Sequence, residues 1–137
     1  MTSHINNIEY KINEPLQEAP IIEVFRSSGI IRPIQDIERI NKMFQNSNLV
    51  VSAWITGELI GLSRALTDFA YCCYLSDLAV KKEYQHKGIG KRLVEITKET
   101  IGDNAMLLLL AAPNAMDYYS KIGFEKAQNG FIIKRKF

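Results

Sequence analysis

Apolar segments bounded by turn-forming residues predict the strands of this protein. Runs rich in apolar, aromatic and β-branched residues are typical of strands. The longest run, YCCYLSDLAV, is apolar enough for a strand in the middle of a sheet. Simple alternation along it places Tyr74 and Ser76 on the face opposite to Asp77. The pattern predicts strands over residues 5–12, 49–55, 59–66, 71–80, 106–111, 124–127 and 131–136.

Helical periodicity occupies the segments between those strands. From Ile89 onward, apolar residues recur at Leu93 and Ile96, which lie on one face of a helix. Pro20 is tolerated only in a first helical turn, and Gly29 is a typical residue just after a helix end. We therefore expect helices over residues 18–28, 34–46, 89–101 and 114–121.

The resulting order is β-α-α-β-β-β-α-β-α-β-β. A helix between residues 71–80 and 106–111 predicts that these two strands lie parallel. The Gln128-Asn129-Gly130 turn joins the last two strands as a hairpin. We expect an α/β fold, α+β in some schemes, with a mixed sheet of about six or seven strands and helices on both faces. The chain of 137 residues is expected to be one domain, residues 1–137.

Charge is unevenly distributed along the chain. The net charge of +2 is too small to indicate a nucleic-acid partner, and the excess of basic residues is confined to residues 81–92. A local basic cluster fits a small polyanionic ligand better than a nucleic-acid backbone. No apolar run is long enough for a membrane span, and the first residues have no signal-peptide core.

Only two cysteines occur, Cys72 and Cys73, and they are adjacent. Neighbouring cysteines seldom bridge each other, so a reducing, cytoplasmic environment fits. No His, Cys, Asp or Glu spacing is typical of a metal site, and we expect no metal.

A glycine turn between strand and helix is the candidate ligand site. The turn QHKGIG, residues 85–90, follows the strand end LAV and opens the helix at Ile89. Free N–H groups at a helix start, close backbone approach at glycine and nearby lysines together favour a phosphate. The spacing excludes a Walker A loop and a Rossmann fingerprint. Taken alone, such a turn is equally common as a simple tight connection.

Two motifs resemble the GNAT superfamily of N-acyltransferases. Gln-x-x-Gly-x-Gly after Leu-Ala-Val resembles its acyl-CoA pyrophosphate loop, and NAMDYYSKIGF at residues 114–124 resembles its second signature. The resemblance covers essentially the whole chain and implies acetyl-CoA-dependent acetylation of a primary amine. In that family the amine attacks the thioester directly within a ternary complex.

The resemblance also implies residue roles. The cosubstrate acetyl-CoA would be bound by a strand edge, the turn and the start of the following helices: Leu78, Ala79, Val80, Gln85, His86, Lys87, Gly88, Ile89, Gly90, Lys91, Asn114 and Tyr119. In the family, the strand before the turn bulges and separates from its neighbour, which leaves its backbone for the pantetheine arm.

Tyr119 and Asp77 are the candidate catalytic residues. Tyr119 aligns with the aromatic pair of the second motif and would protonate the leaving thiolate. Asp77 is the one acid on an apolar strand, and burial would raise its pKa toward that of a general base. A half-buried structural tyrosine and a hydrogen-bonded structural aspartate are the alternatives, and Ser76 with Tyr74 offers a water-mediated route.

The acceptor amine is left open by the sequence. Three segments, residues 28–33, 65–68 and 71–80, resemble a bacterial and plastid branch in which some members act on arylalkylamines such as serotonin. Polyamines, antibiotics and proteins are the other acceptors, and a homodimer is compatible with the family. A non-catalytic acyl-CoA-binding module on the same fold is the alternative function. The candidate side chains for contact with the acceptor are Arg26, Arg32, Trp54, Arg64 and Asp68.

Overall fold

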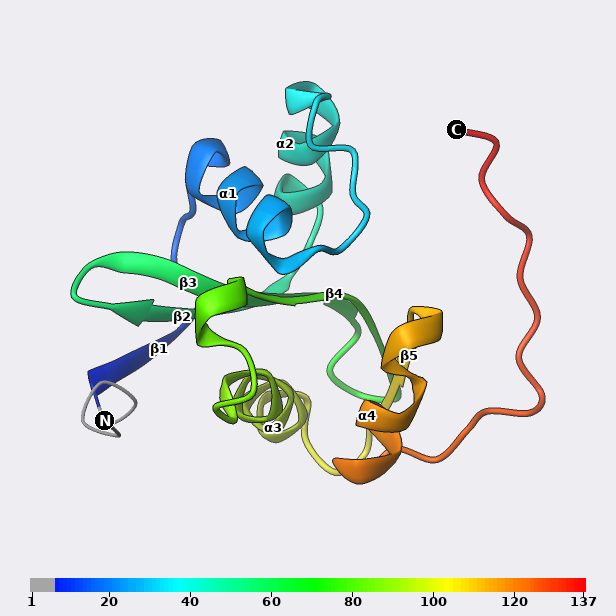
Figure 1. Ribbon diagram of the computed structural model, residues 1–137. Helices are drawn as coiled ribbons and strands as arrows, with labels where there is room; N and C mark the ends of the chain where they lie inside the picture. Colours follow the sequence, from blue (N-terminus) through cyan, green and yellow to red (C-terminus); the bar gives the residue numbers. More distant parts are fainter. Residues whose placement is uncertain (1–6) are drawn as a thin grey trace.

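A computed structural model describes residues 7–137 of the chain (Figure 1). Ile5 and Asn6, the start of the first expected strand, lie outside the described residues. The remaining helices and strands follow the expected order up to the fourth helix. They are β1 (Ile8–Ile12), α1 (Glu18–Ser28), α2 (Ile37–Gln45), β2 (Leu49–Ile55), β3 (Glu58–Thr67), β4 (Cys72–Val80), the 3-10 turn η2 (Lys82–Tyr84), α3 (Ile89–Ile101), β5 (Met106–Leu109), the 3-10 turn η3 (Pro113–Ala115) and α4 (Met116–Lys121).

The sheet has five strands in the order β1-β2-β3-β4-β5. The first three pairings are antiparallel, and β4 pairs with β5 in parallel, as the intervening helix predicts. Helices α1 and α2 cover one face, and α3 covers the other (Figure 1). The expected α/β class with helices on both faces of a mixed sheet is therefore confirmed.

Two apolar layers hold the helices to the sheet. Under α3, Leu93 packs with the buried strand residues Val51 and Leu75. On the other face, Phe25 of α1 and Leu62 of β3 are fully buried in the second layer. Each such side chain, removed from water, stabilises the fold by about 1.5–3 kcal/mol before the entropic cost of ordering it.

A β-bulge at Ser76 changes which residues of β4 share a face. Arg64 of β3 pairs with Asp77, but the next residue, Ala65, pairs with Leu75, so Ser76 has no partner. Leu75 consequently lies in the layer under α3, whereas Asp77 lies on the α1 and α2 face with Arg64. Simple alternation was therefore wrong for Tyr74, which lies on the same face as Asp77, and for Ser76, whose Oγ binds Arg64 on that face.

Strands β4 and β5 separate after a short stretch of pairing. Cys72 to Leu75 pair with Met106 to Leu109, and no pairing with β5 continues beyond Leu75. Residues 76–80 of β4 therefore keep one backbone edge open within the described part of the chain. This separation is what the family resemblance implied for a strand that receives a pantetheine arm.

The C-terminal hairpin is not formed, and the sheet has fewer strands than the expected six or seven. Residues 128 and 129 form a turn, but residues 124–127 and 131–136 are in no strand. Figure 1 shows this segment running outward from α4, away from the sheet. Apolar, β-branched composition favours a strand only when a partner edge and an apolar face are available. Here Phe131 and Ile133 are each 99% exposed.

Residues 7–137 contain neither a helix that could span a membrane nor a cluster of metal-binding side chains. None of their helices combines the length and the hydropathy that crossing a membrane requires. Nor do three or more His, Cys, Asp or Glu side chains of this part of the chain gather where they could hold a metal ion.

Candidate active site

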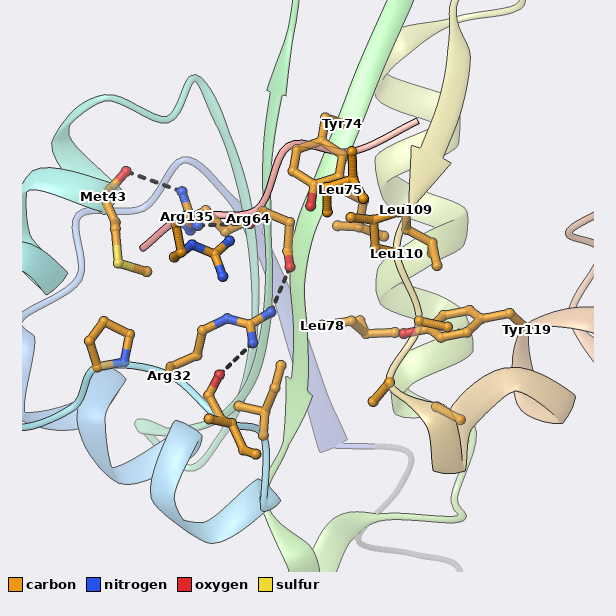
Figure 2. A pocket seen from close by; sticks show the side chains of 18 of the residues that line it. Arg32, Met43, Arg64, Tyr74, Leu75, Leu78, Leu109, Leu110, Tyr119 and Arg135 are labelled. Carbon is orange, nitrogen blue, oxygen red and sulfur yellow. Dashed lines mark hydrogen bonds between the residues drawn. The ribbon is translucent and has the colours of Figure 1, made fainter. Parts of the chain in front are cut away.

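A cavity of about 660 Å³ opens where β4 and β5 separate (Figure 2). Its walls come from the connection between α1 and α2, from both strands, from α4 and from the C-terminal segment. Tyr119 and Leu78 contribute the side near α4, and arginines contribute the opposite side. The cavity therefore joins the open edge of β4 to the surface formed by the first two helices.

Asp77 lies beneath the cavity, held between two arginines. Its Oδ1 accepts a hydrogen bond from Nε of Arg32 and its Oδ2 accepts one from Nε of Arg64, both at 2.5 Å. The Asp77 side chain is completely buried. Both guanidinium groups also bind Ser76: Arg32 donates to its carbonyl oxygen at 2.8 Å, and Arg64 donates to its Oγ at 3.0 Å. The two arginines thus stabilise the bulge of β4 through their ion pairs with Asp77 and their hydrogen bonds to Ser76.

The same arginines connect the sheet to the helical layer above it. Arg32 stands in the connection between α1 and α2, so its ion pair fixes that connection on β4. Arg64 donates to Ser47 Oγ at 3.0 Å, and its guanidinium lies 5.6 Å from the ring centre of Phe44. A charge buried at this depth is compatible with folding because it is paired and hydrogen-bonded on several sides.

Tyr119 directs its hydroxyl into the cavity from α4, toward Leu78 and across from Arg32 (Figure 2). Its ring packs edge-on against Tyr118 and Phe124, with centroids 5.2 and 5.5 Å away. Burial raises the pKa of the Tyr119 hydroxyl, Tyr118 raises it further, and Arg32 opposes the shift. The hydroxyl therefore stays protonated at neutral pH and can donate a proton or a hydrogen bond.

The turn before α3 presents unpaired backbone N–H groups. Gly88 precedes the helix with φ +83°, a value that favours glycine, and no side chain caps the helix start. A Cβ at Gly90 would lie 2.9 Å from the Tyr118 hydroxyl, so glycine lets Tyr118 approach the first turn of α3. The N-terminus of a thirteen-residue helix with free N–H groups fits a phosphate group.

The basic residues around this turn divide into two groups. Lys81 is paired with Glu58 at 2.9 Å, and Arg92 lies 3.3–3.5 Å from Glu95 and Glu99. These two side chains are therefore engaged within the protein. Ion pairs are absent, within residues 7–137, for Lys82, Lys87 and Lys91.

Gln85 and His86 have different surroundings in the turn. Gln85 Nε2 donates to the carbonyl oxygens of Val80 at 2.9 Å and Ser28 at 3.3 Å, which ties the turn to β4 and α1. His86 is exposed and adopts a positive φ of 63°. The Gln85 side chain is thus engaged within the protein, whereas the His86 side chain and the N–H groups at the start of α3 are accessible to a ligand.

The remaining predicted residues fall in different places. Leu78 lines the cavity, whereas the Ala79 side chain is buried in the layer under α1 and α2. Asn114 is exposed in η3, beside the cavity residues Ala112 and Ala115. The structure brings Leu78 and Tyr119 together at the cavity and places residues 85–91 at the start of α3, outside the cavity lining. Their roles in binding and catalysis stay predictions.

The five residues predicted to contact the acceptor do not all lie at the cavity. Only Arg32 and Arg64 line the cavity. Arg26 is paired with Glu23, and Trp54 packs against the layer under α1 and α2. Asp68 organises the turn between β3 and β4: three backbone N–H groups donate to it, which lowers the pKa of its carboxyl to about 2.

Arg39 and Arg135 line the cavity but were not identified from the sequence. Arg39 lies on α2 and reads as an ordinary exposed helix residue. Arg135 lies in the segment FIIKRKF, whose residues 131–136 were predicted as the second strand of the last hairpin. Neither position carries a sequence signal, because only the three-dimensional course of the chain brings them to one cavity.

Comparison with known proteins identifies related acetyltransferases. A family model described as an acetyltransferase (GNAT) domain matches residues 17–134. The chain is 36% identical over 78 residues to GCN5-related N-acetyltransferase 2, chloroplastic, of Arabidopsis thaliana, a match over 53% of this chain and 29% of that protein. The chain thus matches only about a third of the length of that curated relative.

Two solved structures share the fold. A GNAT-family acetyltransferase of Streptococcus pneumoniae TIGR4 superposes with a TM-score of 0.75 at 20% identity, over 94% of this chain and 99% of that one. The aminoglycoside N-acetyltransferase AAC(6')-Iy, solved in complex with CoA, has a TM-score of 0.71 at 12% identity, over 95% of each chain. The family match spans most of the chain and agrees with the five-stranded sheet. The chain therefore belongs to the GNAT family of acetyltransferases.

Proposed function

We propose that residues 1–137 act as one N-acetyltransferase domain, which transfers the acetyl group of acetyl-CoA to a primary amine within a ternary complex. One observation carries this proposal: the open edge of β4 and the Tyr119 hydroxyl face the same cavity. A thioester held along that edge and an amine held in the cavity would meet beside a proton donor. Family membership supports acyl-CoA-dependent transfer in general.

Residues already in position would hold the cosubstrate. The N–H groups of residues 86–91 are suited to its pyrophosphate, with Lys82, Lys87 and Lys91 nearby as screening charges. The N–H of Gln85 already donates to the Lys82 carbonyl oxygen at 3.2 Å, so Gln85 would support the turn. The open backbone edge at Leu78, Ala79 and Val80 is suited to the pantetheine amides, which pair with a strand as another strand would. Asn114, exposed beside the cavity, is suited to the same arm. The thioester supplies the activated acetyl group.

Tyr119 is the proposed general acid. When the amine nitrogen bonds to the acetyl carbon and the carbon–sulfur bond breaks, the sulfur leaves as a thiolate. Tyr119 donates its hydroxyl proton to that sulfur, and the amine nitrogen loses its own proton to solvent. Its raised pKa keeps the proton on the hydroxyl until it is needed.

Asp77, expected as a general base, is better suited to positioning. Both of its oxygens accept hydrogen bonds from guanidinium groups, and its side chain has no exposed surface. A proton from the acceptor would have to displace one of these ion pairs. We infer that Asp77 acts by holding Arg32 and Arg64 at the cavity wall, and that the amine is deprotonated without a protein base.

The proposal is tested by following free thiol from acetyl-CoA in the presence of a panel of amines. Acceptor-dependent release, with the acetylated amine identified by mass spectrometry, is the expected result. Binding of acetyl-CoA, measured by calorimetry, together with no release for any amine would favour the alternative, a non-catalytic acyl-CoA-binding module. If acetyl-CoA were neither bound nor cleaved to free thiol, both functions would be contradicted.

A homodimer is the proposed assembly. Ile132 lies on the cavity, while Phe131 and Ile133 on either side of it are 99% exposed. The outer edge of β5 is also unpaired among the described residues, and its Met106 is 59% exposed. One chain therefore carries both an unpaired apolar segment and an unpaired apolar strand edge. In a dimer, the C-terminal segment of each copy would pair with the β5 edge of the other.

We expect light scattering to give a mass twice that of the 15.6 kDa chain. Changing Phe131→Ser together with Ile133→Ser should lower the mass toward the monomer, because the shared apolar surface is lost. Ile12→Ser, which alters a 51% exposed residue on the opposite edge strand β1, is the matched control. A mass of one chain at all concentrations would contradict the dimer.

A cytoplasmic location, with neither nucleic acid nor membrane as partner, belongs to the same proposal. It rests on the small net charge of +2 and on two thiols that form no disulfide, Cys72 exposed and Cys73 buried.

A further inference from the structure

We propose that the acceptor is an amine that also carries an anionic group, a carboxylate or a phosphate, which the arginines of the cavity bind. This inference rests on the proposed function and names the class of its acceptor. It starts from the charges of the cavity wall, which holds the guanidinium groups of Arg32, Arg39, Arg64 and Arg135.

The cavity has far fewer negative side chains than positive ones. Among the described residues, no Asp or Glu lines it, and Asp77 beneath it is the one Asp or Glu whose carboxylate forms an ion pair with a guanidinium group of the cavity. A single carboxylate between two guanidinium groups leaves one positive charge uncompensated, and Arg135 adds a second. Arg39 is already engaged, because its guanidinium donates to the main-chain oxygen of Phe137 at 3.1 Å. The cavity of about 660 Å³ thus has a positive wall.

Several N–H donors of these arginines remain available. A guanidinium has five N–H donors. Those of Arg32 bind Asp77, Ser76 and the carbonyl oxygen of Ile31, which leaves two without a partner in the protein. Arg135 makes no hydrogen bond or ion pair with residues 7–137. Such forked donors bind carboxylate or phosphate oxygens in pairs.

The arrangement across the cavity fits a bifunctional acceptor. Figure 2 shows Arg32, Arg64 and Arg135 on one side and Tyr119 on the other. An acceptor anchored by its anion on the arginine side would extend its amine toward Tyr119 and the open edge of β4.

The positive wall also bears on how the amine loses its proton. Neighbouring positive charges disfavour an ammonium ion and lower its pKa, so more of the bound amine is the neutral nucleophile. The anion of the acceptor offsets the repulsion that would otherwise prevent binding. This explains how transfer proceeds although both oxygens of Asp77 are engaged.

The same charges oppose other acceptors. Polyamines and aminoglycosides carry several positive charges, and an arylalkylamine such as serotonin carries one without a compensating anion. Like charges brought together in a partly buried site cost binding free energy. The cavity therefore selects against the acceptors that the closer family resemblance suggested.

The test compares matched amines that differ only in the anion. 6-Aminohexanoate is paired with hexylamine, tryptophan with tryptamine, and phosphoethanolamine with ethanolamine, in thiol-release assays on the whole chain. We expect kcat/KM to be at least about tenfold higher for the anionic member of one pair or more, because a charge-assisted pair contributes that much. Equal or lower values for every anionic member would overturn the inference and leave the proposed function standing.

Arg135→Gln is the variant that isolates the binding role, since Arg135 does not contact Asp77 or the β4 bulge. It should raise KM for the preferred anionic acceptor about tenfold, with kcat and the affinity for acetyl-CoA unchanged. Lys136→Gln, one residue away and outside the cavity lining, is the matched control. Equal KM values in the two variants would contradict an anion site at Arg135.

A binding measurement separates this inference from the proposed function. Calorimetry of the CoA-bound protein with 6-aminohexanoate, tryptophan or phosphoethanolamine needs no turnover. Binding that weakens in Arg135→Gln and not in Lys136→Gln would support the anion site even if no thiol is released. No binding of any of the three, with amines lacking an anion accepted as substrates, would overturn it.

Discussion

Tyr119→Phe is expected to lower kcat for acetyl transfer about a hundredfold or more while leaving the affinity for acetyl-CoA unchanged. A positioned general acid contributes rate enhancements of this size, and phenylalanine keeps the ring while removing the proton. The edge-on contacts of the Tyr119 ring with Tyr118 and Phe124 need no hydroxyl, so the fold should persist. Steady-state kinetics with the best acceptor would measure the loss.

The matched control for this change is Tyr118→Phe. Tyr118 is the neighbouring residue, its hydroxyl lies against Gly90, and it does not line the cavity. We expect turnover in this variant to stay within about twofold of the unchanged protein, well below the effect of an acid. Full turnover of Tyr119→Phe would remove the acid role, and equal losses in both variants would indicate a packing effect.

The pH profile follows from the same residue. Burial raises the pKa of Tyr119, and an acid works in its protonated form. Its contribution is therefore complete at neutral and mildly alkaline pH and is lost only when pH rises through the raised pKa. We expect kcat of the unchanged protein to fall at alkaline pH. The residual kcat of Tyr119→Phe should show no such fall, and this difference would support the assignment.

Asp77→Ala is expected to lower the free energy of unfolding by about 3–5 kcal/mol. The change leaves the guanidinium of Arg64 buried without its carboxylate, and Arg64 has only 8% of its side chain exposed. It also releases Arg32 and with it the connection between α1 and α2. Chemical denaturation of the two proteins under the same conditions would measure the difference.

Two comparisons with other variants of this chain make the prediction specific to the buried ion pair. Glu58→Ala breaks the more exposed pair with Lys81 and should cost no more than about 1 kcal/mol. Asp77→Leu combined with Arg64→Met should be more stable than Asp77→Leu alone, because no buried charge is then left unpaired. An Asp77→Ala protein of unchanged stability that lost activity in a pH-dependent way would restore the base role.

The sequence was sufficient for most of the fold because its signals are local. The glycine at position 88, the apolar spacing after Ile89 and the apolar run before the turn each predict their element without reference to distant residues. Family membership then follows from two short motifs in the expected order. The order of elements through α4 was therefore predicted correctly.

The features that sequence did not predict depend on pairing between distant segments. Phe131 and Ile133 have the composition of a strand, but whether they join a sheet depends on an available partner edge. The bulge at Ser76 is set by how β4 pairs with β3, which alternation along one strand cannot reveal. Arg39 and Arg135 lie 96 positions apart and meet only because the chain returns past α2.

The bulge at Ser76 is a place in β4 where a residue can be lost without exchanging the faces of its neighbours. Deleting Ser76 would let regular alternation run directly from Asp77 to Leu75, so Leu75 would stay under α3 and Tyr74 would stay on the Asp77 face. The cost would fall on the arginines, because Arg32 would lose the Ser76 carbonyl oxygen and Arg64 would lose the Ser76 Oγ as acceptors. Loss of a residue elsewhere in the paired part of β4 would instead exchange faces, so a deletion should be tolerated at position 76 more readily than at the paired positions beside it.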